Sequence, residues 1–283
     1  MGICLMKTTF DQKLISSFLL FIDHTLLDKG QAYINYSGRF YSVPTPYNGL
    51  YAYAAPFRQL VFDQGITGAT QFSGIYLNNN FVTIGQSGLQ SINHPDGTIY
   101  FNSQLPTNTV LSGDYSVKEF NTQISDLWEM RLIFDTKYEI NARTSQNLSG
   151  LSSDTKTAPA IFIRYKDTEN KGFAFGGIDD NSLKLRLIAI CNTEFQKIGV
   201  CNIFKNLNFS GIPYITGTLP FSFKGDWTGT PYNYNNLPFD TTYSPFIKEV
   251  RAYDVPQAGE YANINRSMAI LDFEIFTAMR HNT

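Results

Sequence analysis

The stretch from Ser182 to Phe209 constrains the fold of this chain more than any other part of the sequence. Leu183, Leu185 and Leu187 alternate with charged residues, a period of two that is typical of a strand with one buried face. From Leu187 to Cys191 both faces become apolar, as in a strand that enters a covered interior. We therefore predict a β-strand that runs into the core of the fold.

The same stretch continues as a predicted helix, Thr193–Leu207. Thr193 and Gln196 fit a capping box, in which two side chains satisfy free backbone N–H groups at a helix start. Ser210-Gly211, followed by Pro213, ends the helix. The apolar residues at helical spacing are Phe195, Ile198, Cys201, Phe204 or Ile203, and Leu207. The pattern predicts a helix that packs back on a sheet through these side chains.

A second helix is predicted near the start of the chain, over Phe10–Leu27. Apolar residues recur at helical spacing and also occupy the other flanks, so the helix is apolar around most of its circumference. Such a helix is buried in the core or shared with a neighbouring subunit. The apolar segment Leu14–Ile22 is too short, and its flanks too charged, for it to span a bilayer.

The segment Phe72–Ser125 predicts several short strands. Ile75–Leu77 and Phe81–Ile84 flank an Asn run, and Asn tolerates the left-handed backbone of a tight hairpin turn. Leu89–Ile92 and Thr98–Phe101 flank the turn sequence His-Pro-Asp-Gly. Further strands are predicted in Tyr115–Ile124, in Ala32–Val43 (two, around Ser37-Gly38) and in Phe57–Phe62. This spacing of strands indicates an all-β, hairpin-rich subdomain.

The remaining sequence completes an α+β fold that is rich in β-strands. Further strands are predicted at Leu127–Phe134, Ala160–Tyr165 with Phe173–Ile178, Phe246–Tyr253 and Arg266–Thr277, and Ser145–Ala158 is a polar linker. We expect a mixed or antiparallel sheet backed by one or two helices, with the hairpin-rich subdomain inserted. The predicted divisions are residues 1–70 (helix and short strands), 71–126 (hairpins) and 127–283 (α+β domain with a long loop at 211–245).

Composition limits the possible partners. Charged residues make up 16% of the chain, against about 25% in ordinary soluble domains, and aromatic residues make up 15%. This balance is typical of protein interfaces, although a large β-rich core also consumes Phe and Tyr. The net charge of −2 argues against specific nucleic-acid binding.

The sequence carries no motif of catalysis or cofactor binding. It has no phosphate-binding loop, dinucleotide fingerprint, nucleophile elbow or zinc-protease motif. The three His and three Cys are not spaced as metal ligands, and Asp179-Asp180-Asn181 begins like a calcium loop but has Leu183 at the fifth place. We predict no catalytic residue, no cofactor, no metal site and no enzymatic activity.

The long segment Gly211–Pro245 is the clearest candidate for a binding surface. A structureless loop of this length is usually functional or an extended arm. Its aromatic side chains suit a protein interface, a pin that holds the loop on its own core, or a sugar-binding surface. Of these we favour the interface, in which the loop crosses to an adjacent subunit. The candidate interface residues are Phe221, Phe223, Trp227, Tyr232, Tyr234 and Phe239.

Four segments resemble the tail-terminator and neck (head–tail connector) proteins of long-tailed bacteriophages: Ala160–Tyr165, Leu183–Asn192, the helix Thr193–Leu207 and Ser267–Phe276. Those proteins fold as a small α+β domain, a sheet backed by a helix, and form rings. The hairpin-rich insertion and the long loop depart from that pattern.

The resemblance implies a virion structural protein that is made in the host cytoplasm. It would join copies of itself in a ring at the neck or tail end, six-fold or twelve-fold, with other neck or tail proteins as partners. The resemblance implies no membrane partner and no specific nucleic-acid binding, although DNA could pass through the ring. The alternative is a receptor- or carbohydrate-binding tail-tip protein, followed by a wall or polysaccharide hydrolase.

Overall fold

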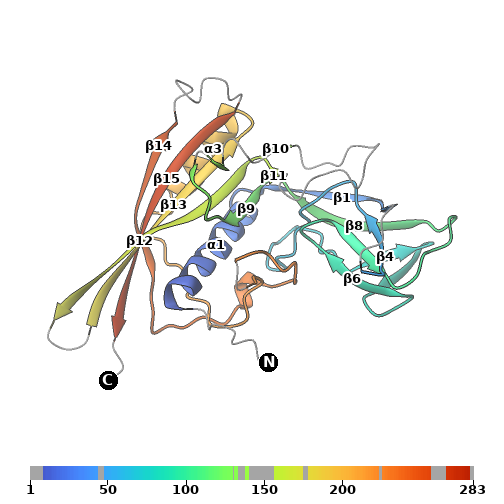
Figure 1. Ribbon diagram of the computed structural model, residues 1–283, viewed down its shortest axis with the longest axis horizontal. Helices are drawn as coiled ribbons and strands as arrows, with labels where there is room; N and C mark the ends of the chain where they lie inside the picture. Colours follow the sequence, from blue (N-terminus) through green and yellow to red (C-terminus); the bar gives the residue numbers. More distant parts are fainter. Residues whose placement is uncertain are drawn as a thin grey trace.

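The computed structural model describes residues 9–43, 48–129, 131–132, 138–139, 156–174, 178–222, 225–255 and 266–280. It has two lobes, one formed by a long sheet with helices and the other formed by short strands (Figure 1). The predicted α+β, β-rich fold with mixed and antiparallel sheets is confirmed.

The first lobe is built on a five-stranded sheet in the order β14-β15-β13-β12-β9. Only β9 and β12 are parallel, and every other neighbouring pair is antiparallel. The strands are β9 (Asn121–Ile124), β12 (Ala160–Ala174), β13 (Ile178–Cys191), β14 (Phe246–Asp254) and β15 (Ser267–Arg280). The sheet therefore contains the predicted strand Leu183–Cys191 at its centre.

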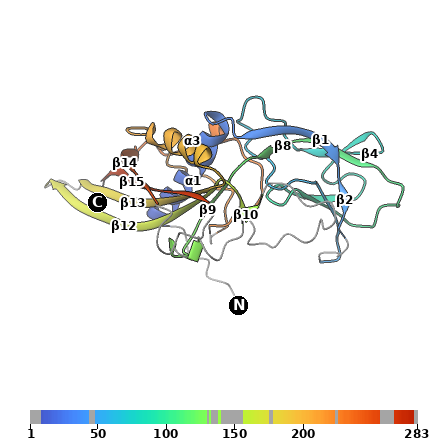
Figure 2. The same ribbon diagram turned by 90° about the horizontal axis from the view of Figure 1, so that it is seen from above.

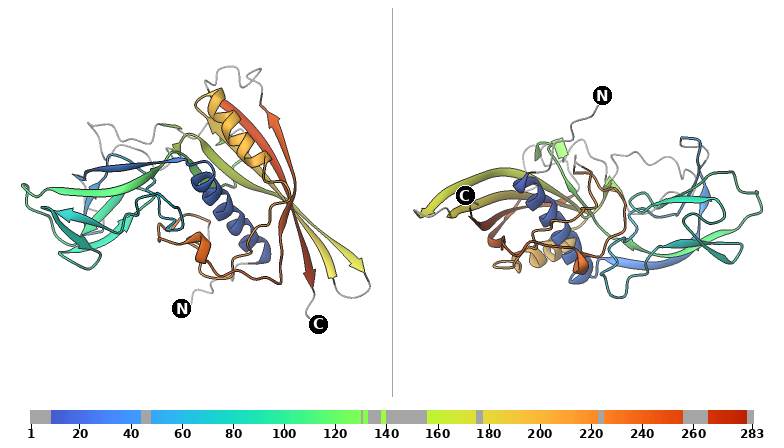
Figure 3. Two further views of the ribbon diagram at one scale, coloured as in Figure 1. Left: turned by 180° about the vertical axis from the view of Figure 1, so that it is seen from behind. Right: turned by 90° about the horizontal axis from the view of Figure 1, so that it is seen from below.

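Two helices, α1 (Phe10–Asp28) and α3 (Glu194–Lys205), cover one face of this sheet, as Figure 3 shows from behind. Phe273 of β15 contacts both, with ring centroids 5.0 Å from Phe18 and 6.3 Å from Phe204. Leu183, Leu185 and Leu187 of β13 point into the same core and are fully buried. The face of β13 that the alternation of leucines predicts to be buried is therefore the face that the two helices cover.

The start of α3 agrees with the prediction, but its buried face does not. Thr193 Oγ1 accepts the N–H of Gln196 at 3.2 Å, which caps the helix. Phe195 is 87% exposed and Ile198 is 50% exposed, so the prediction that both face the core is wrong. Nine positions at about 100° each turn Phe195 to the side opposite Phe204, whose ring is buried.

The second lobe packs two four-stranded sheets around their own core (Figure 2). One sheet has the order β1-β8-β4-β5 and the other β2-β3-β7-β6. The strands are β1 (Tyr33–Arg39), β2 (Tyr41–Ser42), β3 (Tyr51–Ala54), β4 (Gly74–Leu77), β5 (Asn80–Thr83), β6 (Leu89–Asn93), β7 (Thr98–Phe101) and β8 (Leu111–Lys118). Asn78 and Asn79 have φ values of 48° and 69°, so the predicted Asn hairpin is confirmed.

The chain divides differently from the predicted boundaries at 70/71 and 126/127. Strands β1 to β3 belong to the β lobe, whereas α1 and β9 belong to the helix–sheet lobe. The β lobe is therefore inserted between α1 and β9. The predicted strand Tyr115–Ile124 is two strands, β8 and β9, which belong to different lobes.

Several smaller predictions also need correction. Leu127–Phe134 is not a strand where it is described, because Leu132 donates its N–H to the carbonyl of Trp128, as in a helical turn. Leu132 packs on the face of the sheet away from α1 and α3. The break between β1 and β2 lies at Phe40 rather than at Ser37-Gly38, and Phe57–Phe62 forms isolated bridges at Phe57 and Leu60 rather than a strand.

The remaining elements are short. They are the parallel pair β10 (Tyr138–Glu139) and β11 (Lys156–Thr157), and the 3-10 turn η1 (Tyr234–Asn236). Most of the predicted linker at 145–158 lies outside the described residues. Over the ranges given above, no helix has the length and apolar character needed to cross a membrane.

Candidate functional site

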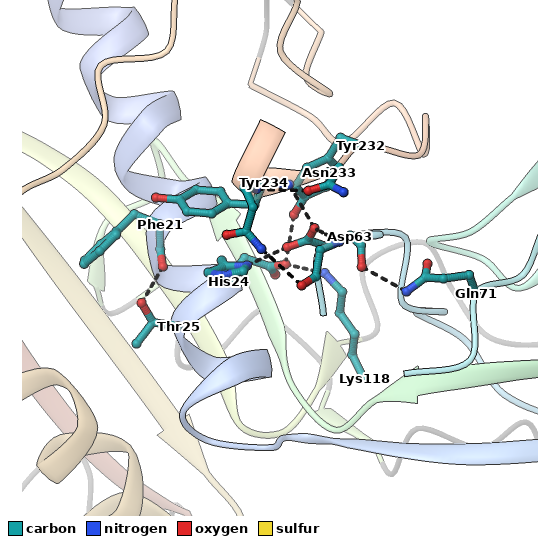
Figure 4. Close-up of polar contacts among 12 residues, drawn as sticks. Phe21, His24, Thr25, Asp63, Gln71, Lys118, Tyr232, Asn233 and Tyr234 are labelled. Carbon is teal, nitrogen blue, oxygen red and sulfur yellow. Dashed lines mark hydrogen bonds and ion pairs between the residues drawn. The ribbon is translucent and has the colours of Figure 1, made fainter. Parts of the chain in front are cut away.

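Charged and polar side chains are buried where the two lobes and the long loop 211–245 meet, as the close-up in Figure 4 shows. Asp23 and Asp63 are completely buried, and Lys118 retains only 4% of its exposure. We call this cluster the junction. It comprises Asp23, His24, Phe62, Asp63, Lys118, Thr122, Trp227, Tyr232 and Tyr234.

The ion pair Asp23–Lys118 lies at the centre of the junction. Lys118 Nζ lies 2.6 Å from Asp23 Oδ2, and the Thr122 hydroxyl donates to Asp23 Oδ1 at 2.7 Å. The Tyr232 hydroxyl also donates to Asp23, at 3.4 Å. A buried charge is tolerated only when it is paired and its remaining hydrogen-bonding groups have partners. The pair thus ties α1 to the last residue of β8.

Aromatic rings surround the ammonium group of Lys118. Its Nζ lies 4.7 Å from the centroid of Phe62 and 5.0 Å from that of Trp227, with Phe120 at 5.6 Å. Cation–π contacts at such distances stabilise a desolvated cation by about 2 kcal/mol. We call these three rings the aromatic box. They come from three separate segments, so the aromatic box forms only when the loop 211–245 lies against both lobes.

The second part of the junction is centred on Asp63. His24 Nδ1 lies 2.7 Å from Asp63 Oδ2, and the backbone N–H groups of Gly65 and Tyr234 donate to Oδ1 at 2.9 and 3.0 Å. The Tyr234 ring stacks on the His24 imidazole, with centroids 4.2 Å apart. Gln71 also donates to the backbone carbonyl of Asp63. These bonds fasten the loop and the segment around Asp63 to α1.

Burial and nearby carboxylates affect the titration of two loop tyrosines. Burial raises the pKa of Tyr232 well above its ordinary value, and the charges of Asp23 and Asp63 raise it further. Burial also raises the pKa of Tyr234, with a contribution from Asp63. Both phenols therefore stay protonated at neutral pH, and Tyr232 remains a hydrogen-bond donor to Asp23.

A third contact connects the loop to the turn between β6 and β7. The buried His94 has Nδ1 2.9 Å from the Gly229 carbonyl and Nε2 3.0 Å from the Phe72 carbonyl. A neutral imidazole carries one N–H and can donate to only one of these carbonyls. Burial lowers the pKa of His94, against the opposing effect of both backbone carbonyls. One carbonyl thus lacks an N–H donor from His94 at neutral pH.

The structure places most of the predicted interface aromatics against the chain's own core. Tyr232 is buried, the tilted rings of Phe221 and Trp227 have centroids 4.3 Å apart, and the Trp227 indole donates to the Thr122 carbonyl at 2.8 Å. This is the arrangement expected if the aromatic residues hold the loop on its own core. Phe239 is 58% exposed and stays available to a partner. Phe223 lies outside the described residues.

Sequence reasoning missed the charged residues of the junction. Asp23 and His24 stand next to each other in a helix that is otherwise apolar on most sides. Such charges inside a buried helix require partners, and this was the one local signal. Asp63 and Lys118 carried none, because Lys118 lies 95 positions from Asp23 in the sequence.

The Asp63–His24 pair also occurs in hydrolase triads, where a nucleophile must lie next to the second imidazole nitrogen. Within the described ranges, no hydroxyl or thiol is hydrogen-bonded to His24. Those ranges also contain no group of three His, Cys, Asp or Glu side chains that could hold a metal ion. Asp179–Asn181 lie in strand β13 rather than in a loop that could wrap a cation. The geometry of the junction is that of a structural clamp.

Two cysteines belong to the core, as predicted. Cys191 is fully buried, and burial raises the pKa of its thiol to about 12. Burial also raises the pKa of Cys201. Thiols in this state are poor nucleophiles. The third, Cys4, lies outside the described residues.

The chain matches no protein-family model, and no curated protein matches its sequence.

Proposed function

We propose that the chain is a structural subunit of a bacteriophage particle that assembles with copies of itself into a ring at the neck or tail end. One observation carries this proposal. The four segments that resemble tail-terminator and neck proteins lie together as one unit, with β12, β13 and β15 adjacent in one sheet and α3 on its face. A sheet backed by helices is the arrangement that the resemblance implies.

The junction supports a structural role for the inserted β lobe. Its buried ion pair and hydrogen bonds connect α1, β8, β9 and the loop 211–245. A lobe held by such bonds keeps a fixed orientation on the helix–sheet lobe. In a ring it would present the same surface from every subunit, which suits docking to other neck or tail proteins.

The alternative of a carbohydrate-binding protein rests on a hollow in the β lobe. The hollow has a volume of about 330 Å³ and is lined by Arg39, Tyr41, Tyr53 and Gln104, among other residues. Aromatic faces beside planar polar side chains suit the apolar faces and hydroxyl groups of a sugar. Calorimetric titration with host surface saccharides tests this alternative, and a Tyr41→Ala variant that binds equally well would count against the hollow.

Mass photometry of the purified chain, followed by electron microscopy, tests the ring. We expect a closed assembly of about six or twelve copies. A chain that stays monomeric over a wide concentration range, and in the presence of other neck proteins, would contradict the proposal.

A further inference from the structure

Three strands of the long sheet continue past the parts that cover them. At the base of this extension Asn181 and Thr277 are still buried, and the Thr168 hydroxyl donates to Asp11 of α1. We call this extension the wing: Lys166–Ala174 of β12, Ile178–Ser182 of β13 and Phe276–Arg280 of β15. Its strands project beyond the helices at one end of the molecule (Figures 1 and 3). Strand β9 pairs only with Ala160–Ile163 of β12, and β14 reaches only Phe276 of β15.

The side chains of the wing differ from those of the covered part of the sheet. Strand β13 is largely apolar over Leu183–Cys191 but reads Asp-Asp-Asn-Ser over Asp179–Ser182. The partner strand carries Glu169, Asn170 and Lys171 at the same level. Surface ion pairs such as Lys171–Glu169, 2.9 Å apart, contribute about 0–1 kcal/mol each. A polar three-stranded sheet gains little stability from burial and needs further strands or a packing partner.

The outer edge of β12 directs backbone groups away from β13. The N–H of Ser125 donates to the carbonyl of Ile163 at 2.9 Å, so Ile163 faces away from β13. Alternate residues share this direction, and the irregularity between Tyr165 and Asp167 shifts it by one position. Thr168, Asn170 and Gly172 therefore face outward in the wing, although the Thr168 N–H already donates to Asp167 Oδ1 at 2.9 Å.

The outer edge of β15 has the same property. Val255 donates its N–H to the carbonyl of Met268, so the even-numbered residues of β15 face β14. Beyond the end of β14, Ala278 and Arg280 continue that direction. In the part of the chain that the structure describes, no strand pairs with either edge of the wing. Exposed edges of this kind are templates for strand pairing with another chain.

We propose that the β12 edge of each wing pairs with the β15 edge of the neighbouring copy, so that the wings form the seam of the ring. This inference rests on the proposed ring. Strands β12 and β15 are both antiparallel to β13, and hence parallel to each other. The seam is therefore a parallel pair between two different edges. A contact between unlike surfaces is the type that closes rings.

Two features of the wing favour a second copy as the occupant. Its charges have both signs, with three basic and four acidic residues, so the wing has a net charge of only −1 and an identical wing meets little repulsion. Its geometry also repeats, because each copy supplies three strands and one free edge of each kind. About six copies would close roughly 18 strands, and barrels of that size leave an aqueous channel.

Cross-linking tests the seam directly. Gly172→Cys and Ala278→Cys place thiols on the two edges, and a cysteine side chain at position 172 meets only an ordinary contact with Asp179. In a Cys4→Ser background, a short bis-maleimide should join the double variant into a ladder that reaches the size of the ring. Each single variant should give no ladder. An Asn108→Cys and Ala278→Cys pair, with one thiol in the β lobe, is the matched control.

Proline provides the complementary test. Gly172→Pro removes an outward N–H, which an edge strand tolerates, whereas Gly172→Ala keeps it. We expect the proline variant to melt like the alanine variant but to lose at least tenfold in assembled fraction. If the Gly172→Pro variant still forms rings and the double-cysteine variant gives no ladder, the proposed seam is wrong but the proposed ring stands. A dimer linked through Gly172→Cys alone overturns the β12–β15 pairing, and a monomeric wild type overturns the proposed function itself.

Discussion

Replacing Lys118 by Met should lower the free energy of unfolding by more than the loss of one surface charge does. The substitution keeps an unbranched apolar side chain inside the aromatic box but removes the ammonium group 2.6 Å from Asp23. Asp23 would then be a completely buried carboxylate without a cation. Breaking a buried ion pair in this way costs about 3–5 kcal/mol. Hydroxyl donors from Thr122 and Tyr232 remain, so we expect the lower end, about 3 kcal/mol.

A second substitution separates the cost of the unpaired charge from the loss of packing. Asp23→Asn removes the carboxylate charge and keeps one acceptor oxygen, whereas Thr122 and Tyr232 donate to two different oxygens of Asp23. In the double variant with Lys118→Met neither member of this pair carries a charge, so we expect about 2 kcal/mol to be recovered relative to Lys118→Met alone. Asp23→Asn alone leaves the buried Lys118 without an anion, so the coupling energy between the two positions should exceed about 2 kcal/mol.

Urea denaturation followed by fluorescence measures these differences, with Lys184→Met as the matched control. Lys184 is 40% exposed and lies 3.8 to 3.9 Å from its partners Glu169 and Asp167, so its loss should change stability by no more than about 0.5 kcal/mol. The reasoning is refuted if Lys118→Met costs less than about 1 kcal/mol, or if the double variant loses as much as the two single variants together.

Three further predictions use other parts of the fold. Leu187→Asp should prevent folding, because an unpaired charge at this fully buried position costs several kcal/mol; a soluble variant with a cooperative melt would contradict this. Because burial lowers the pKa of His94 below 6.5, the unfolded chain binds a proton that the folded chain resists. Stability should fall as the pH drops below about 6.5, and urea midpoints of His94→Gln should show a smaller fall; equal slopes would exclude His94 as the cause. Deleting residues 218–240 should lower the melting temperature, because the buried Tyr232 is lost. A deletion variant that melts like the wild type but does not assemble would instead restore the prediction of an arm that crosses between subunits.

Local signals predicted the elements that are specified by neighbouring residues. The alternation of Leu183, Leu185 and Leu187 predicted a strand, and Thr193 with Gln196 predicted the start of α3. The Asn pair at 78 and 79 predicted its hairpin because Asn accepts positive φ. In each case the determining contacts lie within a few residues of one another.

Long-range contacts were not predictable in this way. Phe195 is as apolar as Phe204, and only the position of the sheet decides which one is buried. The position of the loop 211–245 depends on Asp63 and Thr122, which accept hydrogen bonds from Tyr234 and Trp227. This loop was expected to cross to an adjacent subunit, yet backbone and side-chain bonds to both lobes hold it on its own core without a long regular element.

The position of the junction explains how the fold accommodates an inserted lobe. The chain leaves α1 at Asp28 and enters β1 at Tyr33, and it returns from β8 at Lys118 to β9 at Asn121. Both connections are short, so the base of the lobe lies next to the last turns of α1. The pair Asp23–Lys118 joins α1 to the end of β8 directly, and the loop 211–245 closes over it through Trp227 and Tyr232. A hydrophobic contact at this place would tolerate sliding of one lobe on the other, whereas a buried ion pair with directed hydrogen bonds fixes one orientation. The proposed ring, in which every subunit would present the same surface, would make use of that constraint.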